Sequence, residues 1–218
     1  CESSISMYDA SLVAQFDAQL ISFNADQMLA ADVVGENGTV SVYDAAFIAQ
    51  YVVQNIEGFD NGSWVMQDVE PYFLDQDYLS QEIKAIAIGD PSGNWEPCED
   101  SGRDNEQLLA TASQGEIITI MFNYDEAFQS FQSNLQYDDD KISLHEVYTA
   151  PELEEFTTLT NDLAGNYNYG GFGVEQIFVE DNVMMIDFVC NVDLNNEPIT
   201  INSYYDEITG DITMDVSQ

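Results

Sequence analysis

Oxygen-bearing side chains recur at short intervals in residues 31–53, ADVVGENGTVSVYDAAFIAQYVV. Calcium loops of the helix-loop-helix kind offer about six oxygen ligands at fixed positions, with glycine at the sixth position and an acidic residue at the twelfth. If Asp44 is the twelfth position, Gly38 is the sixth, and the candidate ligands are Asp32, Asn37, Thr39 and Asp44. Asp32 falls one residue too early, so the pattern predicts a calcium loop with an insertion. The alternative is an Asx-rich turn that caps a helix without metal.

The same pattern occurs a second time, closer to the start of the sequence. Residues 6–21 and 41–56 align without gaps and are identical at eight of sixteen positions. In this copy Asp9 is the twelfth position of the loop. The sequence supplies only the later positions of this loop, and its candidate ligands are Glu2, Ser4 and Asp9.

A later turn offers the ligands that the first loop lacks. The stretch DPSGN places Asp90, Ser92 and Asn94 at the first, third and fifth positions of a calcium loop. We expect this turn to fold back beside residues 2–9 and to complete the first site in space. The alternative is a tight turn whose neighbouring Trp95 packs on the core.

Both copies of the repeat predict an amphipathic helix after the acidic loop. Apolar residues recur at helical spacing, at Leu12, Val13, Phe16 and Leu20, and then at Phe47, Ile48, Tyr51 and Val52. We expect the two helices to bury these stripes against each other. A tetratricopeptide array has a similar period, but it needs at least three units and is therefore excluded.

Charge limits the partners of this chain. Its 218 residues include 41 Asp and Glu but only three Lys and Arg, which gives a formal net charge of -38. Nucleic acid binding requires Lys and Arg at the phosphates, so we exclude that partner. The sequence contains no run of about 18 apolar residues, so we expect no membrane span. The acidic surface is compatible with a saline environment, where salt screens the repulsion, and with the binding of divalent cations.

Three cysteines are too few for a disulfide scaffold. Cys1 and Cys98 lie in polar, loop-like contexts, and we expect one disulfide between them. Cys190 ends the apolar run VMMIDFVC and is expected to be a buried thiol.

The second half of the sequence has the texture of a β domain. Short alternating stretches are separated by acidic or glycine-rich turns, at 116–124, 131–137, 142–148, 174–180, 183–192 and 198–205. Strands of this length and spacing are typical of a β-sandwich or jelly roll.

We expect no catalytic activity. The one histidine, His145, has no second histidine or cysteine near it in sequence. The carboxylates are too numerous to single out a glycosidase pair, and no nucleophile elbow or phosphate-binding loop is present.

The paired motifs YDASLVAQF and NGTVSVYDAAFIAQYVV resemble a type I dockerin, a small calcium-binding module that docks onto cohesins in extracellular assemblies. The following residues, through GDPSGNW, are similar to a segment that trails dockerins in some secreted proteins. The resemblance covers residues 1–97 and implies bound Ca²⁺.

The β-rich half resembles a cohesin. The stretches FQSNLQYDDDKISLHEVY and NVMMIDFVCNV are similar to strand patterns of that family. The expected fold class is therefore α+β, with a small helical calcium-binding domain and a trailing β segment over residues 1–97. A linker over 98–107 would lead to an antiparallel β-sandwich or jelly roll over 108–218.

The two resemblances imply a mode of assembly. Dockerins contribute the helix surfaces that follow each calcium loop, and the residues at these positions are Met7, Tyr8, Gln15, Gln19, Val42, Tyr43, Gln50 and Gln54. We expect the two domains to face different ways along a short linker, which disfavours closure within one chain. Each helical domain would then bind the β domain of another copy, head to tail, and such a contact gives a filament when it does not close into a ring.

The sequence thus predicts a non-catalytic extracellular or cell-surface protein that self-associates with calcium into a filament or surface structure. One alternative is a scaffoldin-like adaptor for secreted enzymes, which would bind a partner cohesin or dockerin protein. Another is a carbohydrate-binding accessory domain, with NYNYGGFG at 166–173 as its aromatic platform.

Overall fold

The structure is a computed structural model that describes residues 5–35, 38–66, 84–94, 106–206 and 208–217. Its first part contains three helices, α1 (Met7–Asp17), α2 (Ala25–Ala31) and α3 (Val42–Val52). Helices α1 and α3 both begin with a capping box, in which a serine accepts from the helix amides and an aspartate accepts from the serine amide. The pairs are Ser6 with Asp9 and Ser41 with Asp44.

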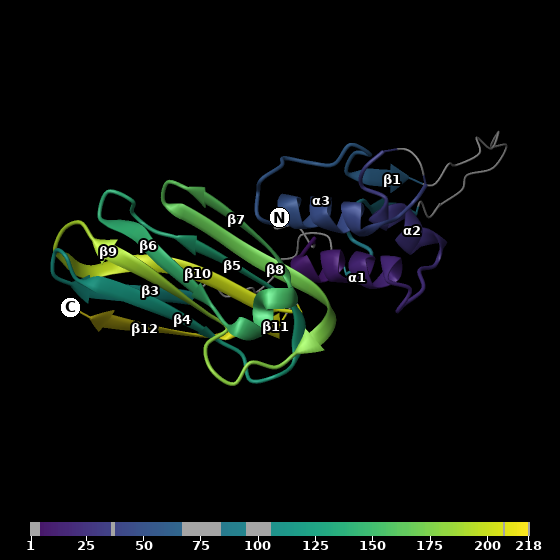
Figure 1. Cartoon of the computed structure of the whole chain (residues 1–218). Coiled ribbons are helices and arrows are strands. Elements are labelled where there is room, and N and C mark those ends of the chain that lie inside the picture. The colour runs from purple at the N-terminus through teal and green to yellow at the C-terminus, as the bar shows by residue number, and fades with distance from the viewer. Residues whose placement is uncertain (1–4, 36–37, 67–83, 95–105, 207, 218) are drawn as a thin grey trace, which may run out of the picture.

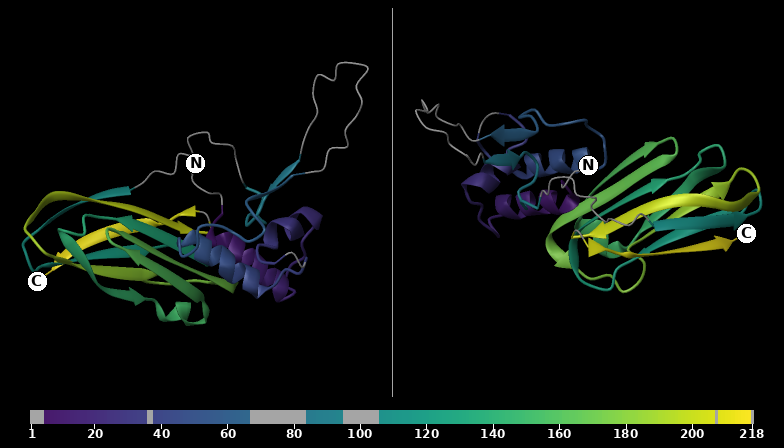
Figure 2. Two further views of the ribbon diagram at one scale, coloured as in Figure 1. Left: turned by 90° about the horizontal axis from the view of Figure 1, so that it is seen from above. Right: turned by 180° about the vertical axis from the view of Figure 1, so that it is seen from behind.

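Helices α1 and α3 lie side by side, as Figures 1 and 2 show. Between them they bury Val13, Ala14, Ile48 and Ala49. Strands β1 (Trp64–Met66) and β2 (Ala85–Ala87) form a two-stranded antiparallel sheet. Ile88, the residue after β2, packs into the same core. The helical unit is defined here as the described residues 5–66 and 84–94.

The second part is an antiparallel β-sandwich. Its strands are β3 (Glu106–Ala112), β4 (Ile117–Asn123), β5 (Phe128–Gln136), β6 (Ile142–Thr149), β7 (Thr157–Leu163), β8 (Asn166–Ile177), β9 (Met184–Cys190), β10 (Leu194–Tyr205), β11 (Ile208–Thr209) and β12 (Asp211–Ser217), with a 3₁₀ turn at Pro151–Glu155. One sheet has the order β11-β10-β5-β8-β7, with β3 also paired to β10, and the other has the order β12-β4-β9-β6.

The sandwich core lies between the two sheets. Alternation along β4 and β9 turns Ile118, Ile120 and Phe122, and then Ile186 and Phe188, inward, so that each is fully buried. The predicted antiparallel β-sandwich is therefore confirmed. Strands β3, β7 and β12 were not predicted. Strands β3 and β7 lack a clear apolar alternation, whereas β12 has one at Ile212, Met214 and Val216 that the sequence analysis missed. Strand β3 begins at Glu106, inside the range 98–107 that the sequence assigns to a linker.

Within the described ranges, no helix is both long and apolar enough to cross a membrane.

Candidate helix and sheet interface

Helix α1 lies on the outer face of the sheet that contains β5 and β8 (Figures 1 and 2). Met7, only 1% exposed, packs over Gly170 of β8. A Cβ atom at Gly170 would collide with the Met7 side chain, so glycine creates the space that this methionine fills. The Met7 amide also donates to Oε1 of Gln132 on β5, at 3.0 Å.

The contact continues one turn further along α1. Ser11 is fully buried, and its hydroxyl donates to the carbonyl oxygen of Gly173 at 2.9 Å. Phe172 of β8 and Leu159 of β7 pack into the hydrophobic core of the helical unit. The helical core and this face of the sheet are therefore one continuous apolar cluster.

The far end of α3 contacts the neighbouring edge strand. Gln54 has a left-handed backbone, with φ of 62°, where the helix ends. Asn161 of β7 donates from Nδ2 to the Gln54 carbonyl oxygen at 2.9 Å, and Asn55 donates from Nδ2 to the Thr160 carbonyl oxygen at 3.3 Å. Both helices thus touch the same surface, called here the docking face and defined by Gln132, Leu159, Asn161, Gly170 and Phe172.

This arrangement corrects two expectations from the sequence. The helical unit packs on the sandwich of its own chain through Met7, Ser11 and Asn55, so the expectation that closure within one chain is disfavoured is wrong. The proposed aromatic platform at 166–173 is also wrong, because it is strand β8. Its Tyr167 and Tyr169 are 4% and 7% exposed within the sandwich core, and Gly170 is covered by Met7.

The expected interface residues fall into two groups. In the first repeat, Met7 is buried against the sheet, and Tyr8 and Gln15 are half-buried. Those of the second repeat point elsewhere, since Val42 is 54% and Tyr43 is 61% exposed. Gln50 is half-buried, and Gln19 and Gln54 are exposed.

The first candidate metal site brings three predicted residues together. Asp9 is fully buried, and its Oδ1 accepts from the Ser92 amide at 3.1 Å while Oδ2 accepts from the amide and hydroxyl of Ser6. Asp90 accepts from the hydroxyl of Ser92 at 2.8 Å. The turn at 90–93 therefore lies beside Asp9, as the sequence predicted. Burial raises the pKa of the Asp9 carboxyl from 3.8 to about 7, and the charge of Asp90 adds to that rise.

The second candidate site is built differently. Asp44 accepts from the amides of Val33 and Val34 through Oδ1 and from Ser41 through Oδ2, so its oxygens are fully used. Asp32 accepts from the Gly38 amide at 2.9 Å through Oδ2, whereas its Oδ1 is buried without a hydrogen-bond partner among the residues that the structure describes. Burial, and then the charge of Asp44, raise the pKa of Asp32.

Some of the residues at the two candidate sites suit a bound cation, and others do not. The buried Oδ1 of Asp32 and the close pair of Asp9 and Asp90 carry negative charge that a cation would offset. Asp44 is saturated with amide and hydroxyl donors. Among the residues that the structure describes, no three His, Cys, Asp or Glu side chains gather closely enough to hold a metal ion.

Several predicted residues lie outside this description. Glu2, Ser4, Asn37 and the expected disulfide partners Cys1 and Cys98 are not among the described residues. Thr39 and Asn94 are exposed, and Cys190 is the buried thiol that the sequence predicted. His145 is exposed on β6.

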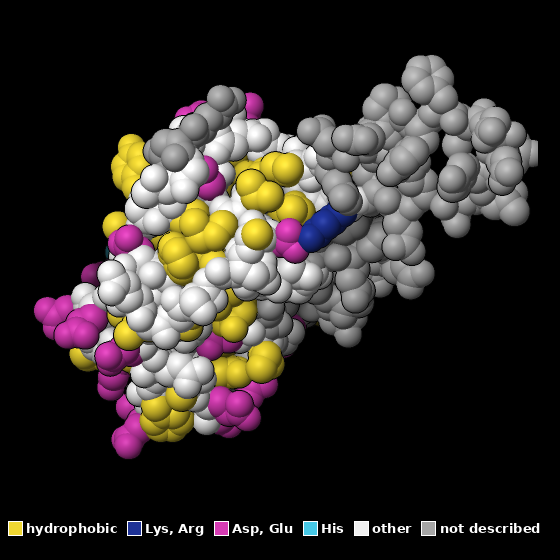
Figure 3. Space-filling view, turned by 90° about the vertical axis from the view of Figure 1, so that its right-hand side faces the viewer, with side chains coloured by type: hydrophobic (Ala, Val, Ile, Leu, Met, Phe, Trp, Pro, Cys, Tyr) yellow, Lys and Arg dark blue, Asp and Glu magenta, His cyan; other side chains and the backbone are white. Residues whose placement is uncertain are grey.

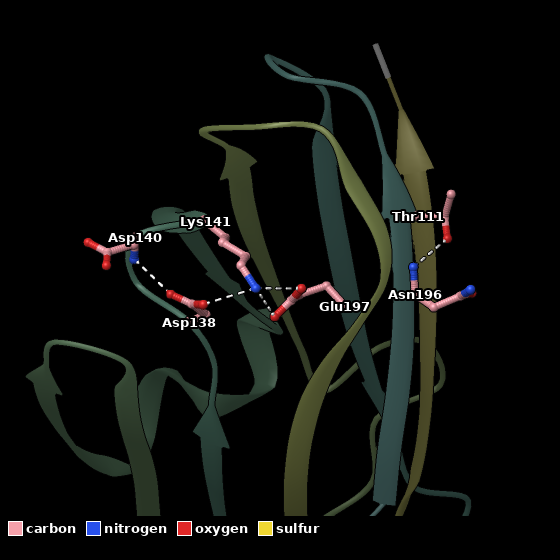
Figure 4. A network of polar contacts seen from close by, with 6 residues as sticks. All are labelled: Thr111, Asp138, Asp140, Lys141, Asn196 and Glu197. Carbon is pink, nitrogen blue, oxygen red and sulfur yellow. Dashed lines mark hydrogen bonds and ion pairs between the residues drawn. The ribbon is translucent and has the colours of Figure 1, made fainter.

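Both ends of the molecule carry an ion pair, and at the helical end it joins Lys84 to Asp26. Figure 3 views the helical end, where apolar side chains gather and most of the visible Asp and Glu lie towards the margins. At the opposite end of the sandwich, Lys141 bridges Asp138 at 3.1 Å and Glu197 of β10 at 2.8 Å (Figure 4). This ion-pair cluster joins the two sheets at that end, since Lys141 precedes β6 of one sheet and Glu197 lies on the other.

No protein family model and no curated protein matches this chain. Among solved structures, it is similar to the sixth cohesin of scaffoldin B from Acetivibrio cellulolyticus, in complex with a Cel5 dockerin mutant, with 8% identity and a TM-score of 0.35 over 50% of this chain and 91% of that chain. A cohesin module from a Clostridium perfringens family 33 glycoside hydrolase has 10% identity and a TM-score of 0.33 over 52% and 95%. A non-cellulosomal cohesin from Archaeoglobus fulgidus has 13% identity and a TM-score of 0.30 over 48% and 82%. At these values the likeness assigns no function to this chain.

Sequence reasoning missed half of the interface. Ser11 and Asn55 contact the sheet but were not among the candidates, and neither were Gln132, Leu159 and Asn161 of the docking face. Gly170 and Phe172 lie in the stretch 166–173, which was predicted only as a sugar platform. The two helix residues carried a usable indication, because the repeats differ there: Ser11 aligns with Ala46, and Asn55 with Leu20. The sheet residues gave no such indication, because the register of the strands decides which of their side chains face the helices.

Proposed function

We propose that this chain is a non-catalytic extracellular assembly protein. Its helical unit is the ligand of the docking face, in the manner of a dockerin and a cohesin, and Ca²⁺ is the ion of the helical unit. One observation carries the proposal: α1 is seated on the sheet through Met7 over Gly170 and through the bond of Ser11 to Gly173. Because copies are identical, a face that fits the helices of its own chain also fits those of another copy.

Closure within one chain competes with assembly between chains. A short connection holds the helical unit near its own docking face at an effective concentration on the order of millimolar. In dilute solution the closed monomer therefore dominates. Where copies are crowded to similar concentrations, as on a cell surface, exchange of the helical unit joins them head to tail.

The interface is chemically suited to such an exchange. A chain with a net charge of -38 repels its copies, but the contacting groups are a thioether, glycine, a hydroxyl and amides. Attraction thus comes from apolar burial and neutral hydrogen bonds. Repulsion between the remaining surfaces is screened to a Debye length of about 3 Å at 1 M salt.

Two full-length variants test recognition between chains. In Gly170→Tyr the sheet is blocked, since an outward tyrosine suits a strand but fills the space of Met7, while the helices stay available. In Met7→Asp the helices are blocked and the sheet stays available. We expect each variant alone to be monomeric by light scattering in 1 M salt with calcium, and an equimolar mixture to form a 1:1 complex.

The control replaces Gly170→Tyr with Asn166→Tyr, four residues earlier on the same strand, where β8 pairs with Gln136 of β5 and Leu163 of β7. Mixed with Met7→Asp, this control chain keeps its own helices docked and should stay monomeric. If Gly170→Tyr and Met7→Asp do not combine at any accessible concentration, recognition between copies is wrong. A complex in which the Gly170→Tyr chain also binds a foreign cohesin would favour the adaptor alternative.

A further inference from the structure

The helical unit carries a cleft that the docking contact does not use. It lies between α2 and the two-stranded sheet of β1 and β2, at the end of the molecule away from the sandwich (Figures 1 and 2). Its volume is about 330 Å³, within the range of about 300–1,000 Å³ that is typical of small-molecule sites. All of the described residues that line it belong to the helical unit, so a ligand in the cleft and the sandwich would occupy separate surfaces.

Part of the lining is aromatic and apolar. Trp64 of β1 is 39% exposed and lines the cleft together with Ile86 of β2 and Pro91. A tryptophan side chain offers a broad, flat, apolar surface at a low cost in conformational entropy, since only two torsion angles become fixed. This part of the cleft therefore suits a ligand that has one flat apolar side.

The rest of the lining includes hydrogen-bond donors as well as acceptors. Lys84 pairs with Asp26 near the start of α2, and the two side chains are 51% and 48% exposed. An ammonium group has three donors and a carboxylate about four acceptor positions, so the pair has capacity beyond its own contact. Asn24 caps α2 through its Oδ1, which accepts from the amides of Asp26 and Gln27. The group that Asn24 can offer a ligand is therefore its Nδ2.

Charge narrows the class of ligand. The chain has a net charge of -38, and Asp26 already neutralises Lys84, so the cleft does not favour an anion. A cation would have to displace Lys84 from Asp26. A neutral ligand avoids both penalties, but it has to supply donors and acceptors together. A pyranose sugar meets this description, because each hydroxyl group both donates and accepts while the C–H groups of the ring make one face apolar.

We propose that this cleft is a saccharide site, which takes a neutral pyranose unit of a polysaccharide. The sugar ring lies on Trp64, and its hydroxyl groups bond to Asp26, Lys84 and Asn24. The inference goes beyond the proposed function, because it gives the helical unit a second ligand. The cleft and the docking face share no residue, so either idea can fail without the other. An assembly of chains would hold one such site in every copy and would bind a polymer more tightly than a single chain does.

Saturation-transfer NMR of the full chain tests the site with three neutral probes, cellobiose, mannobiose and N,N′-diacetylchitobiose. One of them should bind with a dissociation constant on the order of millimolar, as expected for a small ligand with few contacts. We expect Trp64→Ala to abolish the transfer. Lys84→Met should weaken binding about ten-fold, the loss typical of one hydrogen bond to a charged group. Circular dichroism shows whether each variant keeps its helices.

The matched control is Lys141→Met, which removes the other lysine ion pair, at the far end of the sandwich. It should bind the probes as the wild type does. If Trp64→Ala loses its helices, Lys84→Met decides, and an affinity within about two-fold of the wild type overturns the site. Absence of transfer to all three probes also overturns it. Stronger binding of glucose 6-phosphate than of glucose would do the same, since it would mark a phosphate site on Lys84.

Discussion

The first and second repeats have the same helix, the same cap and the same end, yet only the first presents its opening turn to the sheet. Met7 is 1% exposed and Val42 is 54% exposed, although they hold equivalent positions. The loops before the helices differ in the same sense. The Asp44 carboxylate accepts hydrogen bonds from the Val33 and Val34 amides of its own preceding loop. The Asp9 carboxylate instead accepts one from the Ser92 amide, in a turn far along the chain. A repeat thus duplicates a local structure, while its surroundings decide its role.

The largest contrast between the repeats should appear on placing a charge at their equivalent positions. We expect Met7→Asp to cost about 3–5 kcal/mol, because a carboxylate without a partner cannot stay buried against Gly170 and Phe172, and the contact of α1 with the sheet is lost. Val42→Asp should change the free energy of unfolding by about 0.5 kcal/mol or less, since this position is exposed. Urea denaturation of both variants measures the difference. Equal losses would mean that the two repeats are equally buried, against the asymmetry described above.

The next contrast concerns pH. Because the pKa of Asp9 rises from 3.8 to about 7 on folding, the folded chain holds more protons than the unfolded chain between these values. Stability should therefore be unaffected by this group below the unfolded pKa and should fall as the pH rises towards 7, by up to about 4 kcal/mol. Denaturation at several pH values, with chelator and 1 M salt to screen the general repulsion, measures the slope.

Three controls sharpen that measurement. Asp9→Asn should flatten the slope, because the titrating group is gone. Excess calcium should flatten it in the wild-type chain, since a cation favours the charged carboxylate, and Asp32→Asn should weaken any calcium effect that arises at the second loop. A slope that persists in Asp9→Asn would assign the pH dependence to other carboxyls, such as Asp206, whose pKa is also raised by burial.

The smallest expected effect is one that the repeats share. Ser6→Ala and Ser41→Ala each remove a helix cap, at a cost of about 1 kcal/mol. Because the caps have the same geometry, thermal denaturation should give losses that agree within about 0.5 kcal/mol. A much larger loss for Ser6→Ala would show that its cap also holds α1 on the sheet.

Local features of the fold were predictable from the sequence. The repeat, its helices and the strands from β4 to β6 followed from periodicity, and the turn at Asp90 was expected beside Asp9. Other features depend on tertiary structure that no local pattern contains. The polar strand β7, TTLTNDL, has its place in the sheet because β8 pairs with it, and its Asn161 faces the helices only through that register. Gly170 has no side chain to indicate that it forms the space for Met7.

The bond between Ser11 and Gly173 joins residues 162 positions apart. During synthesis the helices leave the ribosome long before β8 exists, and formation of the sheet must precede any seating of α1. Contacts of such sequence separation form late in folding. Every new chain therefore passes through a stage in which its helices have been made but their apolar cluster still lacks Leu159 and Phe172 of the sheet.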